Sequence, residues 1–256
     1  MKHLKSTILV IFIVLAGHLN AQQREQKNYT QSLQGVNWVK IEAGTNIVVK
    51  THNKNELLIK GQSYKVPEKA KGLKRINGGG EDNTGIGFYV AKEGSDLIVK
   101  NASRRNRDFE IYLPASQNIS VNGTWLGDIE IYGFTGEIEA KAESVGNITI
   151  EDVTGPIIAN SNTGTIQVLF NKVNQSSPIS ISSATGKLDV SLPSNTSADV
   201  SLRSTMGEIY TNFDLKMPDK DGLRAISSQR INGTINKGGV EINLRSSTGN
   251  IYLRKQ

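Results

Sequence analysis

A unit made of a glycine, one other residue and an isoleucine recurs through the middle of the chain and constrains its fold more than any other feature. It occurs five times between residues 125 and 170, and the glycines are nine or ten residues apart. These glycines are Gly127, Gly136, Gly146, Gly155 and Gly164. After each unit, apolar and polar residues alternate as they do in a half-buried strand. A fixed period over a stretch of this length is typical of a repeat architecture.

Every second glycine marks a longer step of about 20 residues that continues to the end of the chain. Taken this way, the glycines are Gly127, Gly146, Gly164, Gly186, Gly207, Gly233 and Gly249. The last two steps are 26 and 16 residues, which we interpret as one displaced turn near residues 227–231. We expect all of these glycines, together with Gly136 and Gly155, to lie at corners, because glycine tolerates crowded or left-handed backbone.

The length of the repeat predicts the fold. At roughly 3.3 Å per residue, about 20 residues form one coil of two or three short strands joined by tight corners. Stacked coils pair each strand with its copies and bury one continuous aliphatic column. The sequence therefore predicts an all-β chain folded as a single β-solenoid that resembles a parallel β-helix. An antiparallel β-sandwich is the alternative, because short strands with turns about every 8–12 residues are typical of it too.

The N-terminal residues predict export. Lys2 and Lys5 precede the apolar run 8–16, and Ala21 offers a small residue for cleavage. This run is too short to span a bilayer, so residues 1–21 are interpreted as a cleaved signal peptide with no transmembrane segment after it. We expect a flexible lead over residues 22–32 and one domain over residues 33–256. The predicted location is the periplasm, the outer-membrane surface or the extracellular space.

Composition excludes several kinds of site. The chain has no cysteine, and His52 is the only histidine after residue 21. A Ser-His-Asp triad, a Cys-His pair or a multi-histidine zinc site is therefore not expected, and no catalytic, metal or cofactor-binding residues are predicted. The formal net charge of +6 is a mild excess, without the clustering expected of a nucleic-acid binder.

Two basic segments are the candidate ligand contacts. One is an irregular loop over residues 62–85, and the other is a short run between two predicted strands. Their basic residues are Lys65, Lys69, Lys71, Lys74 and Arg75 in the loop, and Arg104, Arg105 and Arg107 in the run. They could contact an anionic polymer, or they could be solvated turns whose charge protects a strand edge from aggregation.

Acidic and aromatic residues leave one catalytic and one binding alternative open. Polysaccharide-cleaving β-helix enzymes use clustered carboxylates on one face of the helix. The candidate carboxylates are Asp128, Glu130, Glu137, Glu139, Glu143, Glu151 and Asp152, whose alternation with aliphatic residues also suits a solvated strand face. Trp38 and Trp125 could stack on sugars or could serve as partly buried packing.

Two further patterns carry a resemblance to a known family. Strands end in Leu113-Pro114 and Leu192-Pro193, and a Ser-x-x-Gly-x-Ile/Leu unit begins at Ser161, Ser183, Ser204 and Ser246. With the export signal, these patterns resemble the bacterial adhesin-like β-strand repeat family (the DUF4097 and head-GIN type) over roughly residues 33–256. The resemblance implies a β-solenoid of the cell envelope and brings no catalytic residues.

The leading functional hypothesis is an exported, non-catalytic binding or scaffold protein whose partners are envelope glycans or an envelope protein. One alternative is a β-helix enzyme that cleaves polysaccharides. Another is an envelope-stress regulator that binds a membrane partner.

Overall fold

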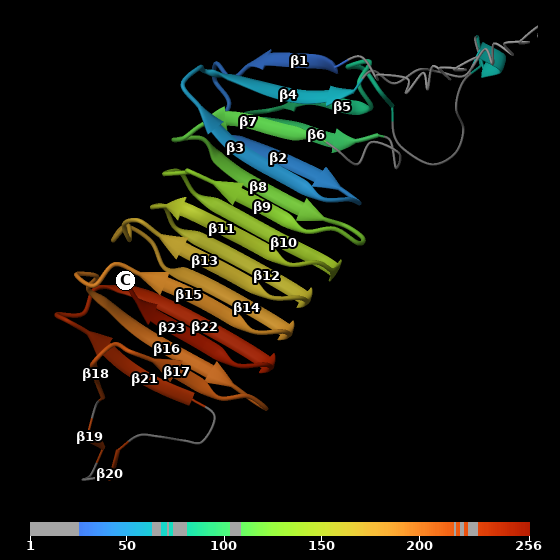
Figure 1. The fold of residues 1–256 in the computed structure, drawn as a ribbon. Coiled ribbons are helices and arrows are strands. Elements are labelled where there is room, and N and C mark those ends of the chain that lie inside the picture. Colours follow the sequence, from blue (N-terminus) through green and yellow to red (C-terminus); the bar gives the residue numbers. More distant parts are fainter. Residues whose placement is uncertain are drawn as a thin grey trace, which may run out of the picture.

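Two large β-sheets lie face to face and form an elongated stack (Figure 1). The computed structural model describes residues 26–62, 68–70, 72–73, 81–102, 109–217, 219–220, 223–224 and 230–256. Among these residues, the strands form a ten-stranded sheet (sheet A), an eleven-stranded sheet (sheet B) and a separate two-stranded pair. The described part contains no helix long and apolar enough to cross a membrane. The predicted signal peptide, residues 1–21, lies outside the described residues.

In both sheets the spatial order of the strands differs from their order along the chain. From one edge to the other, sheet A consists of β1 (Gln26–Ser32), β4 (Glu56–Gln62), β7 (Glu110–Pro114), β3 (Ile47–His52), β9 (Ile129–Tyr132), β11 (Ile148–Val153), β13 (Ile166–Phe170), β15 (Leu188–Leu192), β23 (Ile251–Lys255) and β17 (Ile209–Thr211). Sheet B consists of β18 (Leu215–Lys216), β21 (Arg230–Ile235), β16 (Ala198–Ser204), β22 (Val240–Thr248), β14 (Ile179–Thr185), β12 (Ile157–Thr163), β10 (Ile138–Val145), β8 (Asn118–Gly123), β2 (Trp38–Ala43), β6 (Asp96–Asn101) and β5 (Phe88–Glu93). The separate pair is β19 (Asp219–Lys220) with β20 (Leu223–Arg224), and the short 3-10 helix η1 spans Glu68–Ala70.

One coil of the stack contains two strands, the first in sheet B and the second in sheet A. The coil of β10 and β11 stacks on the coil of β12 and β13 through parallel, in-register pairs such as Ile138 with Ile157 and Ile148 with Ile166. These isoleucines are almost completely buried between the sheets because every second residue of a strand points inward. The body is therefore all-β, rich in parallel pairs and solenoid-like.

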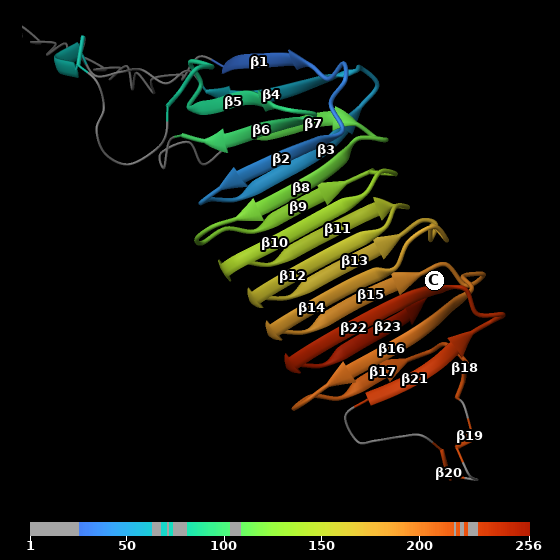
Figure 2. The same cartoon turned by 180° about the vertical axis from the view of Figure 1, so that it is seen from behind.

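The order of the coils in space differs from their order along the chain. The last coil, β22 and β23, lies between the coil of β14 and β15 and the coil of β16 and β17. Both views of the ribbon show it inside the stack (Figures 1 and 2). Gly249 accordingly stacks between Gly186 and Gly207. The prediction of a displaced turn near residues 227–231 is therefore wrong. Between Gly207 and Gly249 the chain forms the outer strands β18 and β21 and then returns into the stack as β22.

The N-terminal part has the same kind of insertion. The first coil, β2 and β3, lies between the coil of β6 and β7 and the coil of β8 and β9. Antiparallel strands then cover both ends of the stack: β1, β4 and β5 at one end, and β21 with β18 at the other. The sandwich alternative fails for the body, where neighbouring strands are parallel, and antiparallel pairing is confined to these caps.

Residues 26–32 correct the expectation of a flexible lead. They form β1, which pairs with β4 along its whole length, from Gln26 with Gln62 to Ser32 with Glu56. The segment is polar because, as an outer strand, its side chains are mostly exposed and the pairing rests on the backbone.

Close stacking of neighbouring coils explains why glycine occupies the corner where the chain passes from sheet B to sheet A. A Cβ atom on Gly146, Gly164 or Gly186 would lie within 3.0 Å of the carbonyl oxygen of the glycine in the neighbouring coil. Three residues before Gly164 and Gly186, Ser161 and Ser183 each donate a hydrogen bond of 3.1 Å to that same carbonyl. Where the Ser-x-x-Gly pattern occurs, it therefore joins one coil to its neighbour.

Gly127, Gly207 and Gly249 lie in the same column, and Gly136 and Gly155 are stacked at the opposite corner. Gly233 does not lie at a corner. It is buried within β21 opposite Val200, where a Cβ would come within 3.2 Å of Leu215 Cβ.

Candidate binding surface

Most of the basic residues predicted to contact a ligand lie outside the described part of the chain. These are Lys65, Lys71, Lys74, Arg75, Arg104, Arg105 and Arg107. Lys69 is described and is exposed in η1. At the end of the expected irregular loop, Asp82 accepts hydrogen bonds from the backbone of Thr84, Gly85 and Gly87, which fixes the chain as it enters β5.

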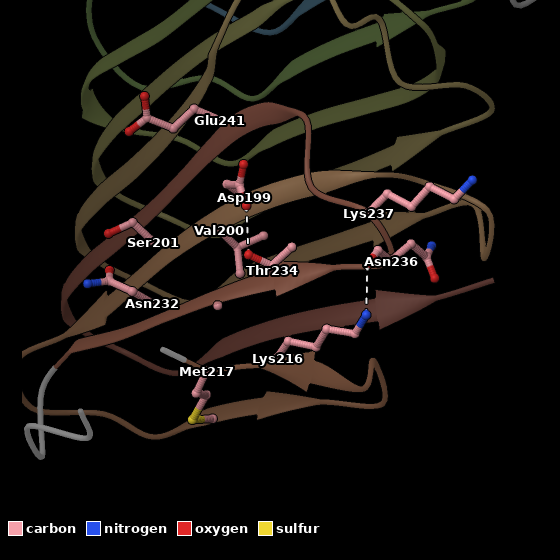
Figure 3. Close-up of a pocket in the computed structure, with 11 residues that line it drawn as sticks. Asp199, Val200, Ser201, Lys216, Met217, Asn232, Thr234, Asn236, Lys237 and Glu241 are labelled. Carbon is pink, nitrogen blue, oxygen red and sulfur yellow. Dashed lines mark hydrogen bonds between the residues drawn. The ribbon is translucent and has the colours of Figure 1, made fainter. Parts of the chain in front are cut away.

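The structure instead presents a pocket of about 810 Å3 at the C-terminal end of sheet B (Figure 3). Its wall comes from β16, β18, β21 and the start of β22. The lining combines acidic Asp199 and Glu241 with basic Lys216 and Lys237. Uncharged polar residues, Ser201, Asn232 and Thr234, lie between them. Such a lining can hold a polar ligand through several different hydrogen bonds.

Hydrogen bonds within the wall fix its shape. Asp199 accepts a bond of 2.8 Å from Thr234 Oγ1 and one of 3.3 Å from the backbone of Gly239. Lys216 Nζ donates to the carbonyl of Asn236 over 3.4 Å, and the Asn236 amide donates to Thr196 over 2.6 Å. Asn236 has a left-handed backbone with φ of 53°, a conformation that asparagine tolerates better than most residues. The pocket is thus a preformed feature of the cap.

The outer face of sheet A carries four tyrosines in a repeated arrangement. Tyr112, Tyr132 and Tyr210 each donate their hydroxyl to the glutamate two residues earlier. Burial, followed by the hydrogen bond to Glu130, raises the pKa of Tyr132 from 10.0 to about 12. The fourth, Tyr252, accepts a bond of 3.1 Å from Asn250. Spacing explains the pattern, because residues i and i+2 of a strand lie on one face.

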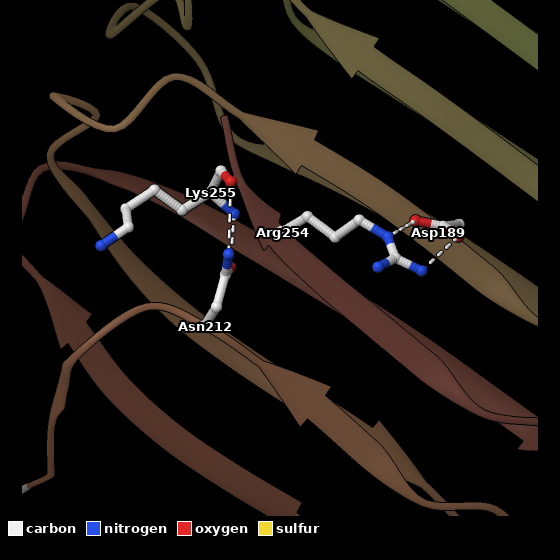
Figure 4. A network of polar contacts seen from close by, with 4 residues as sticks. All are labelled: Asp189, Asn212, Arg254 and Lys255. Atoms are coloured by element: carbon white, nitrogen blue, oxygen red, sulfur yellow. Dashed lines mark hydrogen bonds and ion pairs between the residues drawn. The ribbon is translucent and has the colours of Figure 1, made fainter.

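Two contacts on this face hold the inserted last coil (Figure 4). Arg254 of β23 donates two hydrogen bonds, of 2.7 and 3.1 Å, to Asp189 of β15. On the other side, the Asn212 side chain exchanges hydrogen bonds with the backbone of Lys255. Tyr252 also stacks on Tyr210 of β17, with ring centroids 5.3 Å apart.

The carboxylates considered for polysaccharide cleavage do not form one group. Glu130 and Glu151 belong to sheet A, whereas Glu139 and Glu143 belong to sheet B. Asp128 and Glu137 lie at corners, and Asp152 lies near the end of β11 with φ of 57°. Within the described ranges, no group of three or more histidine, aspartate or glutamate residues is placed to hold a metal ion.

The two tryptophans differ in their surroundings. Trp125 is 58% exposed at the corner between β8 and β9, beside the exposed Leu126 and Val145, whereas Trp38 is half-buried at the start of β2. Sequence reasoning considered these tryptophans and missed the tyrosines. The repeated Glu-Ile-Tyr at residues 110–112, 130–132 and 208–210 was the available signal.

The model of the family described as Toastrack DUF4097 matches residues 88–254. The chain belongs to this family. Two solved structures are also similar to it over 91% of its length. One, from Clostridium sporogenes, is named "putative cell adhesion protein" and has 11% identity, full coverage of its own chain and a TM-score of 0.38. The other, from Bacteroides fragilis, is named "putative adhesin" and has 16% identity, 97% coverage and a TM-score of 0.41. Among proteins with curated descriptions, none matches the chain.

Proposed function

We propose that this Toastrack protein is an exported, non-catalytic binding protein of the cell envelope that acts in an adhesin-like way. The observation that carries the proposal is the preformed pocket at the end of sheet B, whose wall presents charged and uncharged polar side chains. Its donors and acceptors project from paired strands, so a ligand meets side chains that are already in place, and little ordering free energy opposes binding. Export is supported by the signal-like residues 1–21.

The periplasm, the outer-membrane surface and the extracellular space are the proposed locations, with an envelope glycan or an envelope protein as the partner. We further propose that the interior coils, of about 20 residues each, act as a β-solenoid in which each coil is stabilised by its two neighbours. In this arrangement the paired strands of the coils hold the structure together, and the outer faces and the caps bind the ligand.

An array of envelope glycans and extracted envelope proteins tests the binding function with the purified chain. We expect saturable binding to a class of ligands that is reduced by Asp199→Ala or Asn232→Ala in the pocket wall. Ser120→Ala is the matched control, because Ser120 of β8 lies on the same outer face of sheet B, four strands from β22 and outside the pocket. Reproducible hydrolysis or elimination of a polysaccharide by the purified protein would overturn the non-catalytic assignment.

A further inference from the structure

Three arginines occupy one row on the outer face of sheet B, next to the pocket. Arg203 of β16 is in register with Arg245 of β22 on one side and with Arg230 of β21 on the other. Arg245 and Arg230 are exposed, and Arg203 is half-buried between them. Because neighbouring strands are about 4.8 Å apart, the three side chains leave the sheet side by side.

Such a row has an energetic cost, because like charges directly opposite each other on neighbouring strands destabilise a sheet. Several other outward-facing basic residues of this stack are matched by a carboxylate on an adjacent strand. Lys40 Nζ lies 2.6 Å from Asp96, and Arg254 lies 2.7 Å from Asp189. Among the ion pairs of the described residues, neither Arg203 nor Arg245 has such a partner. A bound anion would relieve the repulsion between these two groups.

The neighbouring rows define what kind of anion fits. The next row contains Asn243, Ser201 and Asn232, which are uncharged donors and acceptors. The row after it contains Glu241 and Asp199, which border the pocket, and continues through Thr234 to Lys216 at the sheet edge. Alternate residues of a strand are about 6.7 Å apart, so the acidic row lies about 13 Å from the arginines. Along β22 and β16 the surface therefore changes from basic, through neutral polar, to acidic across a short distance.

We propose that the arginine row binds an acidic glycan, with its carboxylate or sulfate groups on the guanidinium groups and its hydroxyls on the middle row. Guanidinium pairs with carboxylate and with sulfate through two parallel hydrogen bonds, which favours the same geometry for both groups. Negative charge placed further along the strands would meet Glu241 and Asp199, which repel it, so the acidic groups of the glycan lie along the arginine row. This inference rests on the proposed binding function and specifies the class of its ligand.

The test measures binding of the full chain to oligogalacturonate, which supplies carboxylates, and to dextran sulfate, which supplies sulfates, with neutral dextran as the reference. The double variant Arg203→Gln, Arg245→Gln is compared with Lys27→Gln, Lys172→Gln. The control lysines are exposed and lie outside this face, and both variants lose the same charge. We expect at least one acidic polymer to bind, and its affinity to fall about tenfold or more in the arginine variant but less than twofold in the control.

Equal losses in the two variants would show attraction to net charge alone and would overturn the proposal. So would an unchanged affinity in the arginine variant, or preferential binding of single-stranded RNA or of phosphatidylglycerol vesicles. If neutral glycans or envelope proteins bind while the acidic polymers do not, this inference fails and the proposed binding function stands. Folding does not confound the result, because removing like charges should leave the melting temperature unchanged or higher.

Discussion

Arg254 and Asp189 are 65 positions apart in the chain, yet they form a two-bond ion pair on neighbouring strands of sheet A. The pair joins β23, the last strand of the chain, to β15, which belongs to an earlier coil. The pair forms because the last coil of the chain is inserted between two coils that precede it in the sequence.

This ion pair should contribute modestly to stability. Arg254→Gln should lower the free energy of unfolding by a small amount, because the pair is largely exposed but its geometry is bidentate and Arg254 also lies over the Tyr252 ring. A double-mutant cycle with Asp189→Asn, followed by urea unfolding, isolates the coupling between the two residues. The coupling should shrink in about 1 M salt, and a coupling that is insensitive to salt would contradict an electrostatic origin.

Gly146 should not tolerate a side chain. Gly146→Ala would place Cβ within 3.0 Å of the Gly127 carbonyl oxygen, so the coils would have to separate locally. We expect a loss of about 3 kcal/mol in urea unfolding, the upper range for overpacking. Gly44→Ala is the matched control, since the nearest atom to its Cβ lies at 3.6 Å, and it should change stability by less than about 1 kcal/mol. Equal effects at the two positions would show that close stacking is not the cause.

Removal of residues 240–256 should disturb more than the coil that is deleted. β16 and β17 have their parallel partners in β22 and β23, so residues 198–211 would lose these partners and keep only the antiparallel pairing of β16 with β21. Hydrogen exchange should show loss of amide protection in residues 198–211 while residues 138–170 stay protected. Deletion of residues 26–32 serves as the comparison, because β1 is an outer strand and its removal should affect mainly β4. Retained protection of residues 198–211 in the shortened chain would contradict the arrangement.

Tyr132 should make stability depend on pH in the alkaline range. Its pKa is about 12 in the folded chain against 10.0 in the unfolded chain, so the stabilisation is complete below pH 10. Between these values the unfolded state loses its proton first, and the stabilisation, up to about 2 kcal/mol, disappears as the pH rises through 12. Between pH 9 and 11, the free energy of unfolding should decline less steeply with pH in Tyr132→Phe than in the unmodified chain.

Absorbance titration of the phenolate at alkaline pH provides a second readout. Glu130→Gln removes the carboxylate that accepts a hydrogen bond from the Tyr132 hydroxyl. In this variant Tyr132 should ionise at a lower pH than in the unmodified chain. An unchanged titration in this variant would assign the whole shift to burial.

Local features of the fold could be predicted from the sequence because each depends on neighbouring residues. The column of corner glycines follows from Gly127 to Gly186 at a nearly constant step, and a serine three residues earlier accompanies Gly164 and Gly186. The order of the coils could not be predicted in this way. Gly207 and Gly249 have the same local signal, and nothing near either glycine says which of them stacks on Gly186.

The candidate surface was hidden from sequence reasoning for a related reason. Arg203, Arg230 and Arg245 belong to three strands, and only the antiparallel register of β21 and the insertion of β22 bring them into one row. Along the chain they are isolated basic residues, whereas Arg104, Arg105 and Arg107 are adjacent and therefore drew attention. Density of charge along a sequence is a poor guide to density on a sheet, where residues of different strands become neighbours.

The inserted last coil also determines how the molecule would respond to tension. A pull on Gln256, whose backbone and side chain bond to Leu192 and Phe170, acts on a strand held by β15 on one side and β17 on the other. To leave, β23 must slide against both neighbours and break many hydrogen bonds together, whereas an outer strand would peel away one bond at a time. The molecule is therefore built to resist extraction from this end, and a force spectrometer should record one high rupture event before the coils unravel.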